Sequence, residues 1–251
     1  MPKLNLATTT PGEPEIFHSL QGEGVSMGKP SVFVRLSNCN LACHWCDTAY
    51  TWNFRGSEFA HRDDRPDHPA KFERSANSVI WDVEQVAEAI RRFGCERIVF
   101  TGGEPLLQQP ALAALCSLLG AGYHIEIETN GTVELTPEFA AMVHQVNVSP
   151  KLAHSRNPVE KRRNPASLTA FAGDPRAWFK FVVADPADLA EVVELGELFA
   201  IPPQRVLLMA EGIDSATLRT REKWLAPLCL EHGYMLTDRL HIHLYGDTRG
   251  T

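Results

Sequence analysis

Short hydrophobic runs alternate along most of this chain with longer segments of helical periodicity. Several of the short runs have almost no polar residue, which is typical of parallel strands covered by helices. The predicted strands are residues 32–36, 97–101, 124–129, 145–149, 178–183 and 205–209. The predicted helices are residues 79–93, 110–119, 137–144, 187–199 and 215–232.

This alternation predicts the α/β class, with six β/α units and no internal repeat. Because a complete TIM-like barrel has eight such units, we expect a partial parallel (β/α)6 barrel. The chain has 251 residues and is 44% hydrophobic, which fits one domain over residues 1–251 with a sizeable core.

Two polar segments interrupt the alternation. Residues 53–78 are predicted to be an inserted, solvated loop, and a metal site at His61, His68 and nearby aspartates is the less favoured alternative. Residues 153–164 are predicted to be a surface loop, and contact with an anionic substrate or RNA is the weaker alternative. The basic residues of this second segment are Arg156, Lys161, Arg162 and Arg163.

The net charge of −7 argues against general affinity for nucleic acid or an anionic membrane. No apolar run is long enough to span a bilayer, and residues 1–14 lack the pattern of a signal peptide. We therefore expect a cytoplasmic protein with no nucleic-acid or membrane partner.

Cys39, Cys43 and Cys46 form a C-x₃-C-x₂-C motif. Without an export signal, this spacing favours metal binding over disulfides. One zinc ion could be closed by His44 or a distant residue, whereas a 4Fe–4S cluster on three thiolates would leave one iron open to a small molecule. The motif alone leaves both possibilities. The other cysteines are expected to be small buried hydrophobic residues: Cys95, Cys116 and Cys229.

Polar motifs follow the carboxyl ends of the predicted strands, at residues 39–48, 101–105, 128–132, 149–151 and 210–212. In a parallel barrel these segments converge on one rim, where barrel enzymes have their active sites. The Gly102-Gly103 pair permits close approach of the backbone to a ligand, and Glu104 offers an acceptor to a cationic amine. Each segment taken alone is also a plausible turn.

The three-cysteine loop followed by Gly-Gly-Glu at a strand end resembles the radical S-adenosylmethionine superfamily. The resemblance implies a 4Fe–4S cluster whose open iron binds the amino and carboxylate groups of S-adenosylmethionine. It also implies that one electron from the cluster cleaves the sulfonium and gives a 5′-deoxyadenosyl radical, which abstracts hydrogen from the substrate.

A closer resemblance covers most of the chain. The segments that carry it are 17–24 (FHSLQGEG), Arg35, Asp47-Thr48, 101–105, 128–132, 149–151 and 245–251. In these segments the chain resembles the 7-carboxy-7-deazaguanine synthase family. The resemblance implies a lyase of queuosine and 7-deazapurine biosynthesis that uses Mg²⁺. Its reaction would convert 6-carboxy-5,6,7,8-tetrahydropterin to 7-carboxy-7-deazaguanine, with ring contraction and loss of ammonia.

The family's site residues map onto individual positions. Cys39, Cys43 and Cys46 would hold the cluster, and Thr48 would bind magnesium. The S-adenosylmethionine site would comprise Trp45, Cys46, Asp47, Gly103, Glu104, Ser149, Pro150 and Lys151. The substrate site would comprise Leu20, Gln21, Gly22, Arg35, Thr101 and Thr251, the last because the carboxyl-terminal tail would close the active site.

Some of these residues have simpler explanations. Arg35 could pair with a neighbouring acid, and Thr48 could cap a helix. Lys180 is left unassigned, because it could lie along the surface or extend into the site. His241 and His243 alternate with hydrophobic residues, which predicts one face of a strand and favours structural hydrogen bonds over catalysis.

The resemblance also implies two partners: an electron donor such as flavodoxin, and a second copy of the chain, which could pair through the apolar face of residues 215–232. Two other functions remain open at this point. One is a radical S-adenosylmethionine activase that makes a glycyl radical in a partner protein. The other is a zinc-stabilised binding module that uses the three cysteines and His44.

Overall fold

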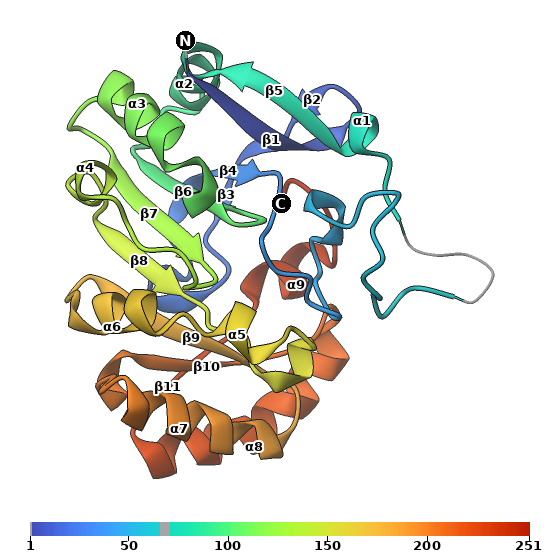
Figure 1. Ribbon diagram of the computed structural model, residues 1–251, viewed down its shortest axis with the longest axis vertical. Helices are drawn as coiled ribbons and strands as arrows, with labels where there is room; N and C mark the ends of the chain where they lie inside the picture. Colours follow the sequence, from blue (N-terminus) through green and yellow to red (C-terminus); the bar gives the residue numbers. More distant parts are fainter. Residues whose placement is uncertain (1, 66–70) are drawn as a thin grey trace.

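A computed structural model describes residues 2–65 and 71–251 (Figure 1). His68, one candidate of the insertion, therefore lies outside the described residues. Within them, the strands form one curved mixed sheet in the order β11-β10-β9-β8-β7-β6-β4-β1-β2, with β3 paired to β4 and β5 paired to β1. Because β11 and β2 end this order without pairing to each other, the sheet is an open, partial barrel.

The parallel part of the sheet runs from β4 to β11. Its strands are β4 (Pro30–Leu36), β6 (Arg97–Gly102), β7 (His124–Thr129), β8 (Gln145–Val148), β9 (Ala177–Val183), β10 (Val206–Ala210) and β11 (Met235–Thr237). The six predicted strands correspond to β4 and β6–β10, so the predicted fold class is confirmed. The short β11 was not predicted, and it adds a parallel strand beyond β10.

Antiparallel strands extend the sheet on the other side. They are β1 (Lys3–Thr10), β2 (Glu13–Pro14), β3 (Ile16–Leu20) and β5 (Ser78–Asp82). The predicted helix over residues 79–93 is wrong in its first turn, because Ser78–Asp82 pairs with β1 along its whole length. The helix begins only at Val83, where the Gln85 side chain accepts a hydrogen bond of 3.0 Å from the Asp82 backbone N–H.

The helices are α1 (Arg74–Asn77), α2 (Val83–Arg91), α3 (Gln109–Leu119), α4 (Pro137–Ala140), α5 (Val159–Arg162), α6 (Pro165–Gly173), α7 (Leu189–Leu198), α8 (Ser215–His232) and α9 (Leu240–Tyr245). Figure 1 shows α3, α4, α6, α7 and α8 along the outer face of the sheet, whereas α9 and the C-terminus lie at its open side. The predictions missed α6 and placed residues 241–243 in a strand.

The main hydrophobic core lies between the sheet and its outer helices. Phe100, Phe179 and Phe181 are fully buried from the strands, and Phe139 is fully buried from α4. Cys116 and Cys229 are buried as predicted, whereas Cys95 is only half-buried. Burial of these apolar faces is the main stabilising contribution to such a sheet.

The segment 153–164 is more ordered and more buried than predicted. It contains α5, and Arg162 within it is buried and paired with Glu191 of α7. Arg163 bonds Glu191 and Glu194. The prediction of a simple surface loop is therefore wrong for these arginines, because two acids of α7 compensate their charges.

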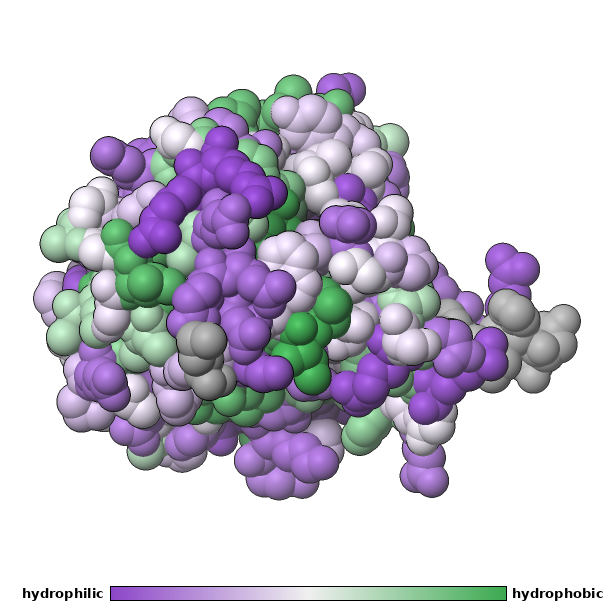
Figure 2. Space-filling model, turned by 90° about the horizontal axis from the view of Figure 1, so that it is seen from above, coloured by the Kyte–Doolittle hydropathy of each residue, from purple (hydrophilic) through white to green (hydrophobic). Residues whose placement is uncertain are grey.

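No helix in residues 2–65 and 71–251 combines the length and the apolar character needed to cross a membrane. Seen from above, hydrophobic residues lie in separate patches among hydrophilic ones (Figure 2).

Candidate active site

The polar motifs at the strand ends surround one cavity of about 430 Å³. This volume lies within the range of small-molecule sites, ~300–1,000 Å³. The predicted site residues that line it are Leu20, Gln21, Gly22, Arg35, Cys39, Cys43, Trp45, Cys46, Asp47, Thr48, Thr101, Gly103, Ser149, Lys151 and Thr251. Glu104 and Pro150 do not line it. The expected convergence on one rim is confirmed.

The cysteine loop follows β4 and presents free thiols to this cavity. Amide groups donate to two of the sulfur atoms: the Leu41 backbone N–H lies 3.5 Å from Cys39 Sγ, and Asn157 Nδ2 lies 3.3 Å from Cys43 Sγ. Such hydrogen bonds to sulfur are a means by which proteins tune iron–sulfur clusters.

Burial raises the pKa of Cys43 to about 12, and burial also raises the pKa of Cys39 and of Cys46. These thiols become thiolates only when a cation offsets the cost, which suits a metal site.

The spacing of the thiols bears on which metal they suit. A tetrahedral zinc with Zn–S bonds of ~2.3 Å would hold its sulfur atoms about 4 Å apart. Among the described residues, however, the one group of three such ligands within 4.8 Å of one another is Glu222, Asp238 and His243. The cysteine sulfurs are spread more widely, which fits a multi-iron cluster better than a single ion.

Gly102 and Gly103 bring the end of β6 against the cysteine loop. A Cβ on Gly103 would lie 1.9 Å from the Asn38 carbonyl oxygen, so no other residue fits there without a shift. Glu104 turns away and is fully buried; its oxygens accept hydrogen bonds from the backbone N–H groups of Leu106 (3.0 Å) and Asn130 (2.7 Å). Gly103, rather than the Glu104 side chain, therefore faces the cavity.

A network of buried charges forms another part of the cavity wall. Glu23 bonds both Lys180 of β9 and Arg239, and Arg239 also bonds Asp47 beside the cysteine loop. Burial alone would raise the pKa of the Glu23 carboxyl, but Lys180 and Arg239 hold it well below its usual range. Lys180, left unassigned from the sequence, thus lies in the cavity wall.

His241 belongs to this wall, and its position corrects the predicted strand. It lies in the helix α9, which ends where Gly246 adopts φ 70°. The ring packs so closely on Gly22 that a Cβ there would lie 2.1 Å from His241 Nδ1. Leu240 N–H donates to the Gly22 carbonyl at 2.9 Å, which fixes α9 against the candidate substrate segment.

Gln21 and Thr101 face two acids of β7. Gln21 Nε2 lies 3.2 Å from both Glu126 Oε1 and Glu128 Oε1, and the Thr101 hydroxyl donates to Glu128 Oε2 at 2.6 Å. Burial raises the pKa of Glu126, and the neighbouring Glu128 raises it further. These groups form a polar floor suited to a ligand with ring nitrogens.

Arg35 pairs with a buried acid. Of the two explanations open from the sequence, a neighbouring acid or a substrate carboxylate, this is the simpler one. Its Nε donates to Glu15 Oε1 at 2.8 Å, and the Tyr50 hydroxyl donates to Glu15 Oε2 at 2.8 Å. The C-terminal tail meets the same group, because Gly250 N–H lies 3.3 Å from Glu15 Oε1 and Arg249 stacks 3.5 Å from the centre of the Tyr50 ring.

Thr48 faces the cysteine loop. Its hydroxyl lies 3.6 Å from Cys46 Sγ and makes no capping hydrogen bond to the short 3₁₀ helix Ala49–Thr51. The capping explanation for Thr48 is therefore not supported, and its oxygen remains available to a ligand in the cavity.

The comparisons with known proteins agree with this geometry. The family model described as "Radical SAM superfamily" matches residues 34–169, from β4 to α6. A 7-carboxy-7-deazaguanine synthase of Halobacterium salinarum is 37% identical over 259 residues, which covers 94% of this chain and 91% of that protein. A synthase of the same name from Pyrobaculum aerophilum is 37% identical over 240 residues, covering 94% and 95%.

The chain belongs to the 7-carboxy-7-deazaguanine synthase family.

A solved structure agrees with the fold. The crystal structure of QueE from Escherichia coli is 26% identical to this chain, covers 94% of it and 95% of its own chain, and gives a TM-score of 0.64. Family membership favours the synthase over the glycyl-radical activase. It also implies a 4Fe–4S cluster and S-adenosylmethionine. The three spaced thiols beside Gly103, two of which accept hydrogen bonds from amide groups, fit such a pair of cofactors.

Part of the predicted insertion, residues 53–78, lines the active-site cavity. His61 is buried, and its Nε2 lies 2.8 Å from the Cys46 carbonyl oxygen. Arg62 bonds Glu211 beyond β10 at 2.6 Å, and both His61 and Arg62 line the cavity. The solvated-loop prediction is wrong for these two residues, because the chain folds back across the cysteine loop.

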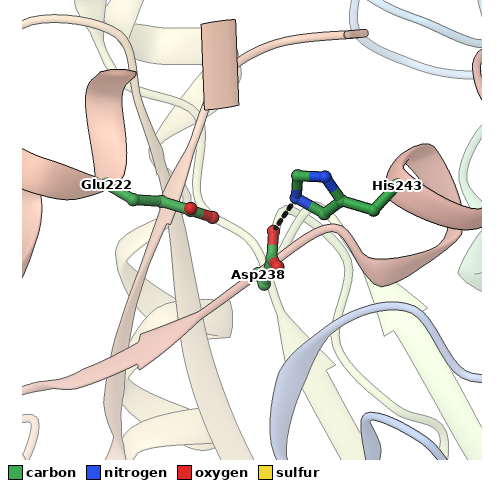
Figure 3. A group of neighbouring side chains, drawn as sticks. All are labelled: Glu222, Asp238 and His243. Carbon is green, nitrogen blue, oxygen red and sulfur yellow. Dashed lines mark hydrogen bonds and ion pairs between the residues drawn. The ribbon is translucent and has the colours of Figure 1, made fainter. Parts of the chain in front are cut away.

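His243 has a structural position outside the cavity. Figure 3 shows His243, Glu222 and Asp238 pointing toward one another from α9, α8 and the segment after β11. His243 Nε2 lies 3.0 Å from Asp238 Oδ1, and its Nδ1 lies 2.8 Å from Ser215 Oγ. This contact anchors α9 to α8, as the preference for structural hydrogen bonds predicted.

Several residues of the site were not assigned from the sequence: Glu15, Glu23, Tyr50, His61, Arg62, Glu126, Glu128, Lys180 and Arg239. A usable signal existed for Glu126 and Glu128, since acids that alternate within a buried strand need polar partners. For Glu15 and Arg239 no such signal existed, because β3 and β11 were not predicted.

Proposed function

We propose that this chain converts 6-carboxy-5,6,7,8-tetrahydropterin to 7-carboxy-7-deazaguanine, with ring contraction and loss of ammonia, in 7-deazapurine biosynthesis. Family membership supports the reaction. The observation that carries the proposal is that one cavity is lined by residues matched separately from the sequence. They are Gln21, Arg35, Thr48 and the three cysteines.

Cys39, Cys43 and Cys46 would hold the cluster, with Gly103 and Ser149 flanking S-adenosylmethionine. When bound, these cofactors supply a 5′-deoxyadenosyl radical that abstracts hydrogen from the substrate. Lys151 would stay beside this site, because its Nζ lies 2.9 Å from Ser149 Oγ.

Gln21 and Thr101, held by Glu126 and Glu128, would orient the pterin ring through hydrogen bonds. Arg35 would receive the substrate carboxylate: Glu15 engages its Nε, which leaves the two Nη groups for a second, bidentate partner. The tail, which lies against Glu15 and Tyr50, would exclude water from this end of the cavity.

Thr48 would bind Mg²⁺, a hard cation that prefers oxygen ligands, together with the substrate carboxylate. The ion would offset charge and orient the migrating centre. The Thr48 hydroxyl lines the cavity and makes no capping hydrogen bond, which supports this assignment.

The proposal includes a flavodoxin-type electron donor and a homodimer. For the dimer, Leu230 on α8 is 86% exposed and provides an apolar contact. Mass photometry at nanomolar to micromolar concentration tests this point; a monomer throughout that range contradicts it.

The reaction is tested anaerobically with reconstituted protein, dithionite, S-adenosylmethionine and 6-carboxytetrahydropterin, with and without Mg²⁺. We expect a deazapurine chromophore that depends on substrate and increases with Mg²⁺. Release of 5′-deoxyadenosine without the chromophore would overturn the substrate assignment. One bound zinc and no iron after reconstitution would instead favour the binding module.

A further inference from the structure

Glu222, Asp238 and His243 form a group of polar side chains outside the active-site cavity (Figure 3). We call this group the α9 cluster. One possible ligand atom of each residue lies within 4.8 Å of the other two, and the described residues form no other group of three such ligands. The members come from α8, from the segment after β11 and from α9, so the cluster joins three separate parts of the chain.

Two carboxylates and one imidazole make a ligand set that suits zinc. Zn²⁺ binds histidine nitrogen and carboxylate oxygen at ~2.0–2.2 Å, so its tetrahedral ligands lie about 3.3 Å apart. His243 Nε2 and Asp238 Oδ1 already lie 3.0 Å apart. Mg²⁺ and Ca²⁺ prefer oxygen ligands alone, whereas imidazole favours zinc. The two carboxylates, when ionised, also balance the charge of one zinc ion.

The ring of His243 is held from outside the cluster. Its Nδ1 lies 2.8 Å from Ser215 Oγ, at the start of α8. With the proton on Nδ1, this hydroxyl accepts a hydrogen bond and Nε2 keeps a lone pair directed at Asp238. A second hydrogen bond of this kind is how proteins orient a histidine that binds a metal.

The Glu222 carboxylate is the member that points most directly to a cation. Its Oε1 is buried and has no hydrogen-bond partner in residues 2–65 and 71–251. Within the same ranges, no lysine or arginine makes an ion pair with Glu222 or Asp238. Because a buried acceptor without a partner is costly, a cation between the two acids would stabilise this arrangement.

We propose that the α9 cluster binds one Zn²⁺ ion through Glu222, Asp238 and His243, with water as the fourth ligand. The side chains of Asp238 and His243 are 32% and 16% exposed, which leaves a path for the ion and for that water. The site is separate from the three cysteines, and the inference does not depend on the proposed reaction.

The ion would fix α9, and α9 belongs to the active-site wall. Arg239, next to Asp238, bonds Glu23 and Asp47, and His241 of α9 packs on Gly22. A metal ion that binds only the folded chain stabilises the folded state and restrains the elements that hold it. Zinc at the α9 cluster would therefore restrain this part of the cavity wall from outside, without contact to the substrate.

The site is tested by equilibrium dialysis of the reconstituted holoenzyme against Zn²⁺, with zinc and iron measured by elemental analysis. We expect one zinc per chain and unchanged iron. Glu222→Gln should bind zinc at least ~100-fold more weakly, because a direct ligand is lost. This variant should still fold, since it removes repulsion between two acids. Zinc that replaced iron at the cysteines would be unaffected by Glu222→Gln, so the difference between the two proteins isolates the α9 cluster.

Two further variants sharpen the test. Ser215→Ala keeps all three ligands and should weaken zinc binding by about 10-fold, because the His243 ring loses its orienting partner. His18→Ala, at an exposed histidine of β3, is the control and should bind zinc as the wild type does. An equal loss of affinity in His18→Ala and Glu222→Gln would overturn the site.

Hydrogen exchange of Leu240–Tyr245 tests the effect on α9. Zinc should slow exchange of these amides in the wild type and leave it unchanged in Glu222→Gln. Absence of bound zinc beyond the cysteines, or equal affinity in wild type and Glu222→Gln, overturns the site. Bound zinc with unchanged exchange of α9 overturns the restraint of the cavity wall. Displacement of the zinc by an equal concentration of Mg²⁺ overturns the choice of metal.

Discussion

On one side of the active-site cavity, Cys39, Cys43 and Cys46 come from a single loop after β4. In another part of the cavity wall, Glu23 meets Lys180 and Arg239 across sequence separations of 157 and 216 residues. We call the first the thiol side and the second, with Asp47, the charged side. The thiol side is set by local spacing, and the charged side exists only when the whole chain has folded.

The energetics of the two sides differ accordingly. The thiols are neutral, with pKa values raised by burial, and need an external cation before they ionise. The charges of Glu23, Asp47 and Arg239 compensate one another within the chain. The thiol side should therefore depend on metal loading and the charged side on folding, and the following experiments separate the two.

The largest effect is expected at the thiol side. Cys43→Ala should remove a cluster ligand and lower turnover more than ~100-fold, beyond what loss of an outer-shell partner costs a metal site. Iron content should fall, whereas the urea midpoint of the iron-free protein should change little. Cys95→Ala, at a half-buried cysteine outside the cavity, is the control. Normal iron content in Cys43→Ala would contradict the assignment.

Substitutions at the charged side should mainly lower the free energy of unfolding. Arg239→Met leaves Glu23 and Asp47 without a shared partner, and removing one member of a buried ion pair costs about 3–5 kcal/mol. Urea unfolding of the iron-free protein measures this cost. Lys180→Met should cost less, because Arg239 still contacts Glu23. The control is Arg219→Met on α8, expected within ~0.5 kcal/mol of wild type; equal effects of Arg239→Met and Arg219→Met would refute the network.

A smaller effect is expected where the two sides meet. Thr48→Ala should raise the Mg²⁺ concentration for half-maximal turnover about 10-fold, because an oxygen ligand is lost, while Thr48→Ser should remain close to wild type. A Mg²⁺ titration of anaerobic turnover measures it. Thr169→Ala, at an exposed position of α6, is the control. A lower turnover with an unchanged Mg²⁺ requirement would show that Thr48 acts otherwise.

The smallest effect is expected at Glu222 and Asp238, two neighbouring acids that are not part of the charged side. Burial, together with Asp238, raises the pKa of Glu222 to about 7. The folded state therefore holds a proton that the unfolded chain releases near pH 4.5, so stability falls as pH rises between these values. Glu222→Gln should raise the free energy of unfolding by ~1 kcal/mol at pH 8, a value reduced for solvent screening of this partly exposed group. The increase should be smaller at pH 5. Equal gains by urea unfolding at both pH values would contradict this.

The same contrast explains which features could be predicted from the sequence. Hydrophobic periodicity located β4 and β6–β10, and their carboxyl ends located the rim, because both depend on local patterns. The cysteine spacing and the Gly102-Gly103 pair placed the thiol side for the same reason. The resemblance to a known family supplied Gln21, Arg35 and Thr48.

Features set by distant pairing could not be predicted. Residues 78–82 have the periodicity of a helix start, and only the edge of β1 makes them a strand. His241 and His243 alternate as in a strand, yet α9 forms because it packs on Gly22 and bonds Ser215. The positions of Lys180 and Arg239 in the site could not be predicted, because both depend on contacts with Glu23, which is remote in the sequence.

The contact between Gly22 and α9 has a consequence for biosynthesis. The three cysteines proposed to hold the cluster leave the ribosome early and close together, whereas Gly22 acquires its partner only when His241 has been made. Contacts of such high sequence separation form late, since loop closure must come first. We expect nascent chains to present the three thiols well before a substrate cavity exists. Metal loading can therefore precede completion of the fold.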